Sequence, residues 1–180
     1  MRKLTYLLIL SVFLTSCGAE NQGEQTKKYF DLKGLIEQQI KVLEKRKPMI
    51  QKTISMAEKS ESQQIKSVDW TKELELFTQA DLNKPAFISS YNIDSSANGI
   101  KYVLKETEKL PIKYLTISKV GGRTTQIETL MSNENYLYQS EKHLKLSLIN
   151  EQLSDYQIDG FQKVVFGDKK DFKINGKIAQ

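Results

Sequence analysis

The stretch Tyr-Leu-Tyr-Gln-Ser-Glu-Lys-His-Leu-Lys-Leu-Ser-Leu-Ile, residues 136–149, decides the fold class of this chain. Leu144, Leu146 and Leu148 are separated by single polar residues, and Tyr136 and Tyr138 fall in the same register. Because successive side chains of a β-strand point to opposite faces, this alternation predicts a strand with one apolar face and one polar face. The strand therefore belongs to a sheet whose apolar face needs a cover.

The same alternation runs through the chain on both sides of this strand, from Pro85 onward. Strands are predicted over residues 86–93, 100–107, 112–120, 124–131, 136–149, 156–166 and 172–178. Short turns separate them, and Gly121-Gly122 is typical of a hairpin turn. Seven strands with short connections and no intervening helix favour an antiparallel meander.

Residues 31–47 have the pattern of an amphipathic helix ahead of the strands. Asp31 is placed to cap its first turn, and Pro48 ends it. Apolar residues recur at steps of three and four, at Leu32, Leu35, Ile36, Ile40 and Leu43.

A second, shorter helix is expected to begin after Asp69 and to end near Ala80. Its apolar face would carry Trp70, Leu74 and Phe77. Its outer face would carry Lys72, Glu73 and Glu75. We expect both helices to cover the apolar face of the sheet.

Residues 49–67 are open to two interpretations. Ile50, Lys52, Ile54 and Met56 alternate with other polar residues, which favours a further N-terminal hairpin. A helix that continues past Pro48 is the alternative. The predicted fold class is α+β: an antiparallel β-meander of about seven strands, with this hairpin as a possible addition, packed against two helices. One globular domain would span residues 29–180.

The first residues of the chain resemble a bacterial lipoprotein signal. Positive charge at Arg2 and Lys3 precedes an apolar run, residues 4–14, that is too short to span a bilayer. The tetrapeptide that ends it, Leu14-Thr15-Ser16-Cys17, is similar to the lipobox cut by the lipoprotein signal peptidase. This resemblance implies that residues 1–16 are a removed signal peptide and that Cys17 carries a diacylglycerol thioether. Residues 17–28 would then be the lipidated cysteine and a flexible tether reaching roughly 20 Å.

Four further motifs resemble a group of uncharacterised small lipoproteins of Bacteroidota-type bacteria. They are Tyr29-Phe30-Asp31-Leu32, Asp69-Trp70-Thr71-Lys72-Glu73-Leu74, Asp81-Leu82-Asn83-Lys84-Pro85 and Gly160-Phe161-Gln162-Lys163. The resemblance covers nearly the whole mature chain and implies a lipid anchor in the cell envelope, with the outer membrane as the expected location. It implies no catalytic activity.

Charge and residue chemistry argue against several other classes of protein. The formal net charge of +5 falls to +3 if Arg2 and Lys3 leave with the signal, a weak signature for nucleic-acid binding. The single histidine, His143, has no second histidine or cysteine nearby, which argues against a zinc site. We expect it on the outer face of its strand, in register with Glu141 and Lys145. No cofactor motif occurs.

Paired carboxylates are the remaining candidates for catalysis, as in glycoside hydrolysis. Glu73 and Glu75 would point to different faces of a helix. Asp155 and Asp159 would share a strand face at roughly 13 Å, which is too far for that chemistry. Both pairs are better interpreted as surface charge.

The function that the sequence favours is a membrane-anchored, non-enzymatic binding or scaffolding module. Its partners would be the lipid bilayer, through acyl chains on Cys17, and an envelope protein or glycan. Tyr136, Tyr138 and Tyr156 are candidate ligand-binding residues, although completing the core with hydroxyls at its rim is the favoured role for them. The alternative is a carrier of an apolar, lipid-like ligand in a half-barrel cavity. An envelope hydrolase is the third candidate.

Overall fold

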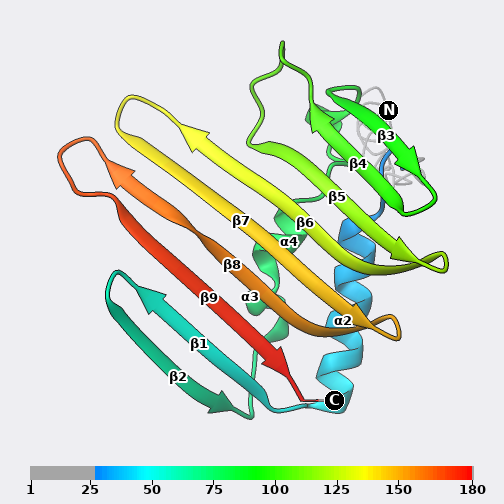
Figure 1. Ribbon diagram of the computed structural model, residues 1–180, viewed down its shortest axis with the longest axis vertical. Coiled ribbons are helices and arrows are strands. Elements are labelled where there is room, and N and C mark those ends of the chain that lie inside the picture. Colours follow the sequence, from blue (N-terminus) through cyan, green and yellow to red (C-terminus); the bar gives the residue numbers. More distant parts are fainter. Residues whose placement is uncertain (1–26, 180) are drawn as a thin grey trace, which may run out of the picture.

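A single antiparallel sheet of nine strands dominates this computed structural model, which describes residues 27–179 (Figure 1). The order across the sheet is β2-β1-β9-β8-β7-β6-β5-β4-β3. The strands are β1 (Ile50–Met56), β2 (Lys59–Ile65), β3 (Tyr91–Ser96), β4 (Gly99–Leu104), β5 (Ile112–Val120), β6 (Arg123–Glu134), β7 (Tyr138–Ile149), β8 (Gln152–Val164) and β9 (Lys170–Ile178).

The seven strands from β3 to β9 form the expected meander, and the β1–β2 hairpin extends it beyond β9. Ile50 pairs with Ile178, so the first strand of the chain lies beside the last. The α+β class and the antiparallel sheet are thus confirmed, with nine strands rather than about seven. A helix past Pro48 is the wrong interpretation of residues 49–67, since the preceding helix ends at Lys47 in the left-handed conformation (φ 48°).

Helix α2 (Leu32–Arg46) follows the predicted stripe. The Asp31 side chain caps it by accepting a hydrogen bond from the Gly34 amide at 2.9 Å. Of the five apolar residues in the stripe, Leu32, Ile36 and Leu43 are buried, whereas Leu35 and Ile40 are partly buried. The amphipathic pattern therefore located the buried face correctly.

The second predicted helix is divided in two, which corrects the expectation of one element. Helix α3 (Trp70–Glu73) ends at Leu74, whose backbone leaves the helical region at φ −101°, ψ 9°, and α4 (Glu75–Gln79) begins there. Trp70, Leu74 and Phe77 are nevertheless all buried, as predicted.

Several strand boundaries also differ from the prediction. The strand expected over residues 156–166 is β8, which begins at Gln152 and ends at Val164. The strand expected over residues 86–93 begins only at Tyr91, because Pro85 opens a short 3-10 helix, η1 (Pro85–Phe87). The strand expected from Tyr136 begins at Tyr138, and Tyr136 lies in the β6–β7 turn instead.

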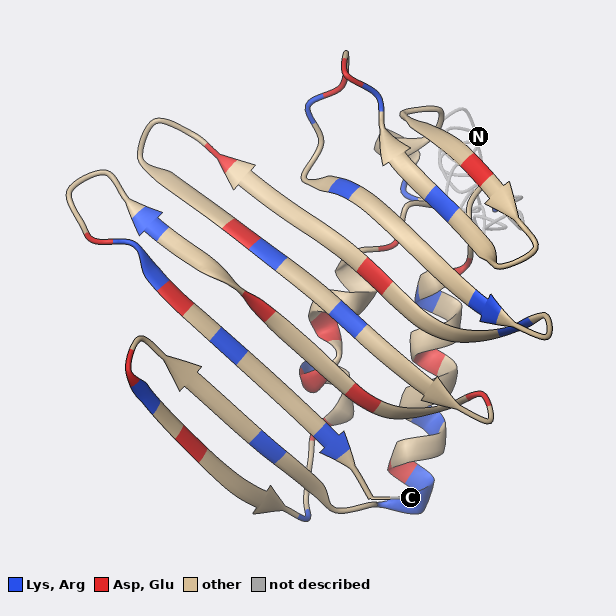
Figure 2. Ribbon diagram, in the orientation of Figure 1, with Lys and Arg blue, Asp and Glu red and all other residues tan. Residues whose placement is uncertain are grey.

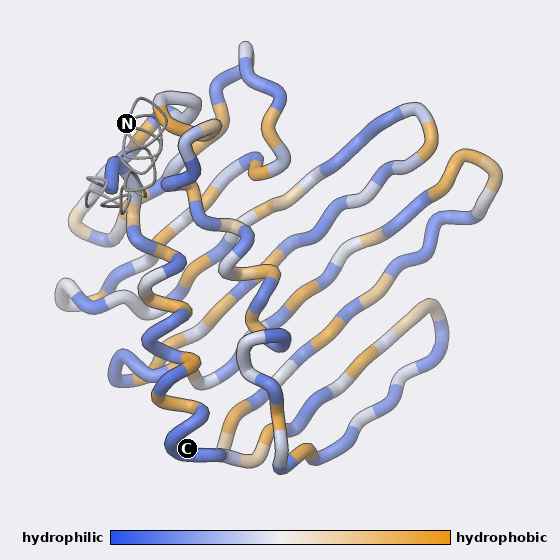
Figure 3. Tube along the Cα trace, turned by 180° about the vertical axis from the view of Figure 1, so that it is seen from behind, coloured by the Kyte–Doolittle hydropathy of each residue, from blue (hydrophilic) through white to orange (hydrophobic). Residues whose placement is uncertain are grey.

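The core lies between the sheet and the helices, which all cover the same face (Figure 3). Aromatic rings meet edge to face within it: Phe77 contacts Tyr156 at 6.1 Å between centroids, and Tyr29 contacts Tyr91 and Tyr102 at 5.7 and 5.4 Å. Among residues 27–179, the buried core residues run from Tyr29 to Ile178. Within residues 27–179, no helix has the length and apolar character needed to cross a membrane.

Candidate functional site: the uncovered face of the sheet

The face of the sheet opposite the helices carries an unbroken row of polar side chains, which we call the central polar row. Cross-strand pairing places one member on each strand: Ser62, Thr53, Asn175, Gln157, Lys145, Glu128, Thr116, Lys101 and Asp94. Figure 2 is viewed from this side, and it shows acidic and basic positions interspersed along the strands. No apolar residue interrupts the row, which forms a polar platform across the uncovered face. A neighbouring register of the same face carries Val103, Tyr114 and Leu130.

Hydrogen bonds and ion pairs within and beside the row orient its side chains. Lys145 Nζ lies 3.5 Å from Glu128 Oε1, and Gln126 Nε2 donates to the same carboxylate at 2.8 Å. Thr53 and Ser62 share a hydroxyl hydrogen bond of 2.9 Å. Because each group still has unused donors or acceptors, the row can bond to a ligand without being rearranged.

A shallow depression of about 480 Å³ lies over the middle of the platform. Its lining includes Gln51, Thr53, Lys145, Asp155, Gln157 and Asn175. Asp155 accepts hydrogen bonds from the hydroxyls of Ser147 and Ser154, at 2.8 and 2.7 Å. The depression therefore offers carboxylate, ammonium, amide and hydroxyl groups within one open surface.

His143 lies on the same face, in register with Glu141 and Lys145 as the sequence predicts. Its Nδ1 is 3.9 Å from Asp159 Oδ1, which is longer than a hydrogen bond. The ring is tilted against Tyr114 at 6.4 Å between centroids, and burial raises the pKa of the Tyr114 hydroxyl. Asp159 accepts a hydrogen bond from Gln157 at 2.6 Å. Within the described residues, His143 Nε2 is buried without a hydrogen-bond partner, so no serine or cysteine is hydrogen-bonded to this nitrogen of the imidazole.

On the opposite face, Tyr156 belongs to a polar cluster beneath α3. Its hydroxyl donates to Glu73 Oε1, and Lys52 Nζ lies 2.7 and 2.9 Å from the two oxygens of the same carboxylate. Burial raises the pKa of Tyr156, so the phenol stays a protonated donor. The expectation that Glu73 points outward is wrong: its carboxylate is mostly buried and ties α3 to β1 and β8, whereas Glu75 is exposed.

The three candidate tyrosines do not converge on one site. Tyr156 is buried with its hydroxyl at the rim of the core, which is the favoured role in the sequence prediction. Tyr138 begins β7, and Tyr136 is 86% exposed in the β6–β7 turn. The sequence analysis does not predict the central polar row. The sequence shows alternate polar residues on each strand, but it does not show which of them pair across neighbouring strands.

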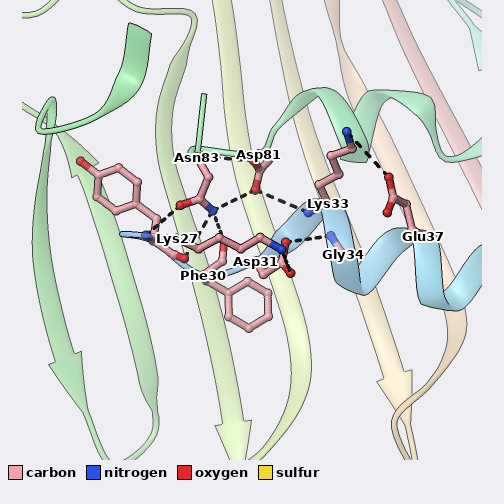
Figure 4. Close-up of polar contacts among 9 residues, drawn as sticks. Lys27, Phe30, Asp31, Lys33, Gly34, Glu37, Asp81 and Asn83 are labelled. Atoms are coloured by element: carbon pink, nitrogen blue, oxygen red, sulfur yellow. Dashed lines mark hydrogen bonds and ion pairs between the residues drawn. The ribbon is translucent and has the colours of Figure 1, made fainter. Parts of the chain in front are cut away.

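A cluster of hydrogen bonds fixes the point where the chain enters the fold (Figure 4). The Asn83 side chain accepts from the Tyr29 amide at 2.9 Å and donates to the Tyr29 and Phe30 carbonyls at 3.3 and 3.1 Å. Asp81 accepts from the Asn83 amide at 3.1 Å. The segment that follows the predicted tether is therefore held firmly against the loop after α4.

Other predicted sites are distributed as follows. Cys17 lies outside the described residues. Asp155 and Asp159 share the open face of β8. Among residues 27–179, no group of histidine, cysteine and carboxylate side chains is arranged to hold a metal ion.

The chain was compared with protein families, curated proteins and solved structures. No protein family, no curated protein and no solved structure matches the chain.

Proposed function

We propose that this chain is a membrane-anchored lipoprotein of the bacterial cell envelope, attached to the outer membrane through acyl chains on Cys17. The support is the order of basic residues, apolar run and Leu14-Thr15-Ser16-Cys17. Two acyl chains suffice for stable attachment. Asn83 then holds Tyr29 and Phe30, directly after the predicted tether, so that the domain is presented from a fixed exit point.

We further propose that the domain is a non-enzymatic binding module whose ligand lies on the uncovered face of the sheet. The observation that carries this proposal is the central polar row together with its depression of about 480 Å³. A continuous series of donors and acceptors across the sheet is suited to an extended hydrophilic polymer. Between the two expected partner classes, we favour an envelope glycan, because its hydroxyls both donate and accept hydrogen bonds.

The packing between helices and sheet weighs against the alternative of a carrier for an apolar ligand. Trp70, Leu74, Phe77 and Tyr156 fill the space in which a lipid chain would lie, and all four are almost inaccessible to solvent. A carrier needs a hollow at that place. The described interior is instead closely packed by the chain's own side chains.

Intact-mass analysis of the protein extracted from membranes tests the anchor. The expected mass corresponds to a chain that begins at Cys17 and carries a diacylglycerol group. A retained leader, or a mature chain with a free thiol, would contradict the proposal. The Cys17→Ser variant is the control, because it offers no sulfur for the thioether.

Sedimentation with insoluble envelope polysaccharide tests the ligand-binding face. Gln157 and Asn175 are paired across β8 and β9 on the open face, so Gln157→Ala/Asn175→Ala should weaken binding about tenfold, since each lost hydrogen bond contributes roughly 0.5–1.5 kcal/mol. The matched control, Asn133→Ala/Gln162→Ala, removes the same two amide types from exposed positions of the opposite register.

Three results would contradict the proposed role. Equal weakening by both double variants would show that the polar row is not the binding face. Release of soluble fragments from the polysaccharide would show an enzyme instead of a binding module. Recovery of a specific envelope protein, without polysaccharide binding, would identify the other partner class.

A further inference from the structure

Two neighbouring turns carry a group of solvent-exposed apolar side chains, which we call the apolar tip. It consists of Tyr136 and Leu137 in the β6–β7 turn and Val164, Val165 and Phe166 at the β8–β9 turn. The Phe166 side chain is 99% exposed, and Leu137, Val164 and Val165 are about half exposed. Contiguous exposed apolar groups mark interaction sites more often than single ones do.

A backbone hydrogen bond joins the two turns: the Val165 amide donates to the Leu137 carbonyl at 3.0 Å. Within the β8–β9 turn, the Gly167 amide donates to the Val164 carbonyl at 3.0 Å. Within the β6–β7 turn, Asn135 Oδ1 accepts from the amides of Leu137 and Tyr138, at 2.9 and 3.0 Å. The turns are thus shaped by polar groups, and Phe166 and Tyr136 project from an already ordered scaffold.

The apolar tip lies at the end of the sheet that the helices leave uncovered. Figure 3 shows a hydrophobic stretch in each of the two turns, well away from α2 and α4. The charges nearest to it in sequence are balanced, with Lys163, Lys169 and Lys170 against Glu134, Asp168 and Asp171. Lys169 is itself engaged, 3.0 Å from Asp171 and 4.4 Å above the Phe161 ring. The charged residues beside the apolar tip therefore favour neither an acidic nor a basic partner.

We propose that the apolar tip inserts into the interfacial region of the lipid bilayer, giving the domain a second membrane contact. This inference rests on the proposed anchor, because a tether of roughly 20 Å keeps the domain close to the bilayer. Projecting turns fit between lipid headgroups. Phe166 enters the acyl region, and Tyr136 lies at the boundary with its hydroxyl toward water. Anchor and tip together orient the polar row relative to the membrane.

Tryptophan fluorescence tests the insertion directly. Trp70 is the only native tryptophan and is buried, so the wild-type spectrum provides a constant background. Phe166→Trp places a reporter at the tip. Val120→Trp is the matched control, because Val120 is also an exposed apolar residue (71%) but lies at the β5–β6 turn, at the opposite end of the strands (Figure 1).

In the acylated protein reconstituted into phosphatidylcholine vesicles, we expect a blue-shifted Phe166→Trp emission that brominated lipids quench. The Val120→Trp emission should stay unshifted and unquenched. Equal emission of the two reporters, both typical of water, would overturn the proposal even if the anchor is present. A tip buried against another protein would instead give a blue shift without quenching by brominated lipid, which also overturns it.

The unacylated chain of residues 18–180, which keeps all the buried core residues from Tyr29 to Ile178, separates the tip from the anchor. Its partition into phosphatidylcholine vesicles should fall at least about tenfold in Phe166→Asp, because a charge replaces a large apolar group, while Val120→Asp should have little effect. Equal partition of the two variants would overturn the tip proposal. Failure of the anchor would appear separately, as a missing acyl mass on Cys17, and would leave this result valid.

Discussion

The two faces of the sheet are built from alternate residues of the same strands, yet they have opposite physical roles. On β7, Leu144 and Leu146 are fully buried under the helices, while His143 and Lys145, on either side of Leu144, lie half-buried on the open face. The covered face supplies the apolar burial that stabilises the fold. The open face carries half-buried and exposed polar side chains, and we expect it to contribute less to stability than the covered face does.

The sharpest way to test this comparison is to truncate neighbouring residues on β7. Leu144→Ala should lower the free energy of unfolding by about 2–5 kcal/mol, because it removes buried methyl groups and leaves a cavity. Lys145→Ala, one residue later, should lower it by less than about 1 kcal/mol, since its ion pair with Glu128 is partly exposed. Urea denaturation of both variants measures the difference.

The same pair of variants also separates stability from ligand binding. Leu144→Ala should leave polysaccharide binding unchanged under conditions in which the protein remains folded, whereas Lys145→Ala should weaken binding. A large loss of stability in Lys145→Ala would show that the two faces are not independent.

The buried polar cluster is the exception on the covered face, and Glu73 tests it. Glu73→Ala should destabilise the protein by about 1–3 kcal/mol, because it leaves Lys52 and the Tyr156 hydroxyl without their shared partner. Glu75→Ala removes the same side chain from an exposed position and should change stability by less than about 0.5 kcal/mol.

A double variant identifies the cause of that effect. Lys52→Met added to Glu73→Ala should recover part of the lost stability, because the uncompensated ammonium is gone. If the double variant is less stable than Glu73→Ala alone, loss of packing rather than an unpaired charge is the dominant effect.

The covered face was more predictable from the sequence than the open face. Periodicity alone indicated α2, the strands of the meander and the burial of Trp70, Leu74 and Phe77, because apolar spacing is a local property. The inward turn of Glu73 was not predictable, since its partners Lys52 and Tyr156 lie 21 and 83 residues away.

The central polar row and the apolar tip were also not predictable, because each combines residues that are distant in the sequence. The central polar row depends on strand register, which brings Thr53, Asn175 and Gln157 side by side from distant segments. The sequence predicts Phe166 at the end of a strand, whereas β8 ends at Val164 and Phe166 is exposed in the turn. The sequence likewise predicts Tyr136 in a strand, but that strand begins two residues later.

The smallest expected effect concerns the helix cap at Asp31, on the covered side of the molecule. Although burial opposes it, hydrogen bonding to Lys27 and to the Gly34 amide lowers the pKa of Asp31 below its usual value. A carboxyl whose pKa is lower in the folded state stabilises the protein above its unfolded pKa of about 3.9, and this contribution is lost as the pH falls through the folded value. Because the pair with Lys27 is substantially exposed, we expect less than about 0.5 kcal/mol.

Asp31→Asn isolates this charge, because asparagine caps a helix about as well as aspartate does. Wild type should be slightly more stable than the variant near pH 7, and the difference should disappear in acid, as measured by thermal unfolding across this pH range. Asp94→Asn, at an exposed strand position, is the control for the loss of a negative charge. A difference that persists unchanged in acid would assign the effect of Asp31 to the shape of the cap and not to its charge.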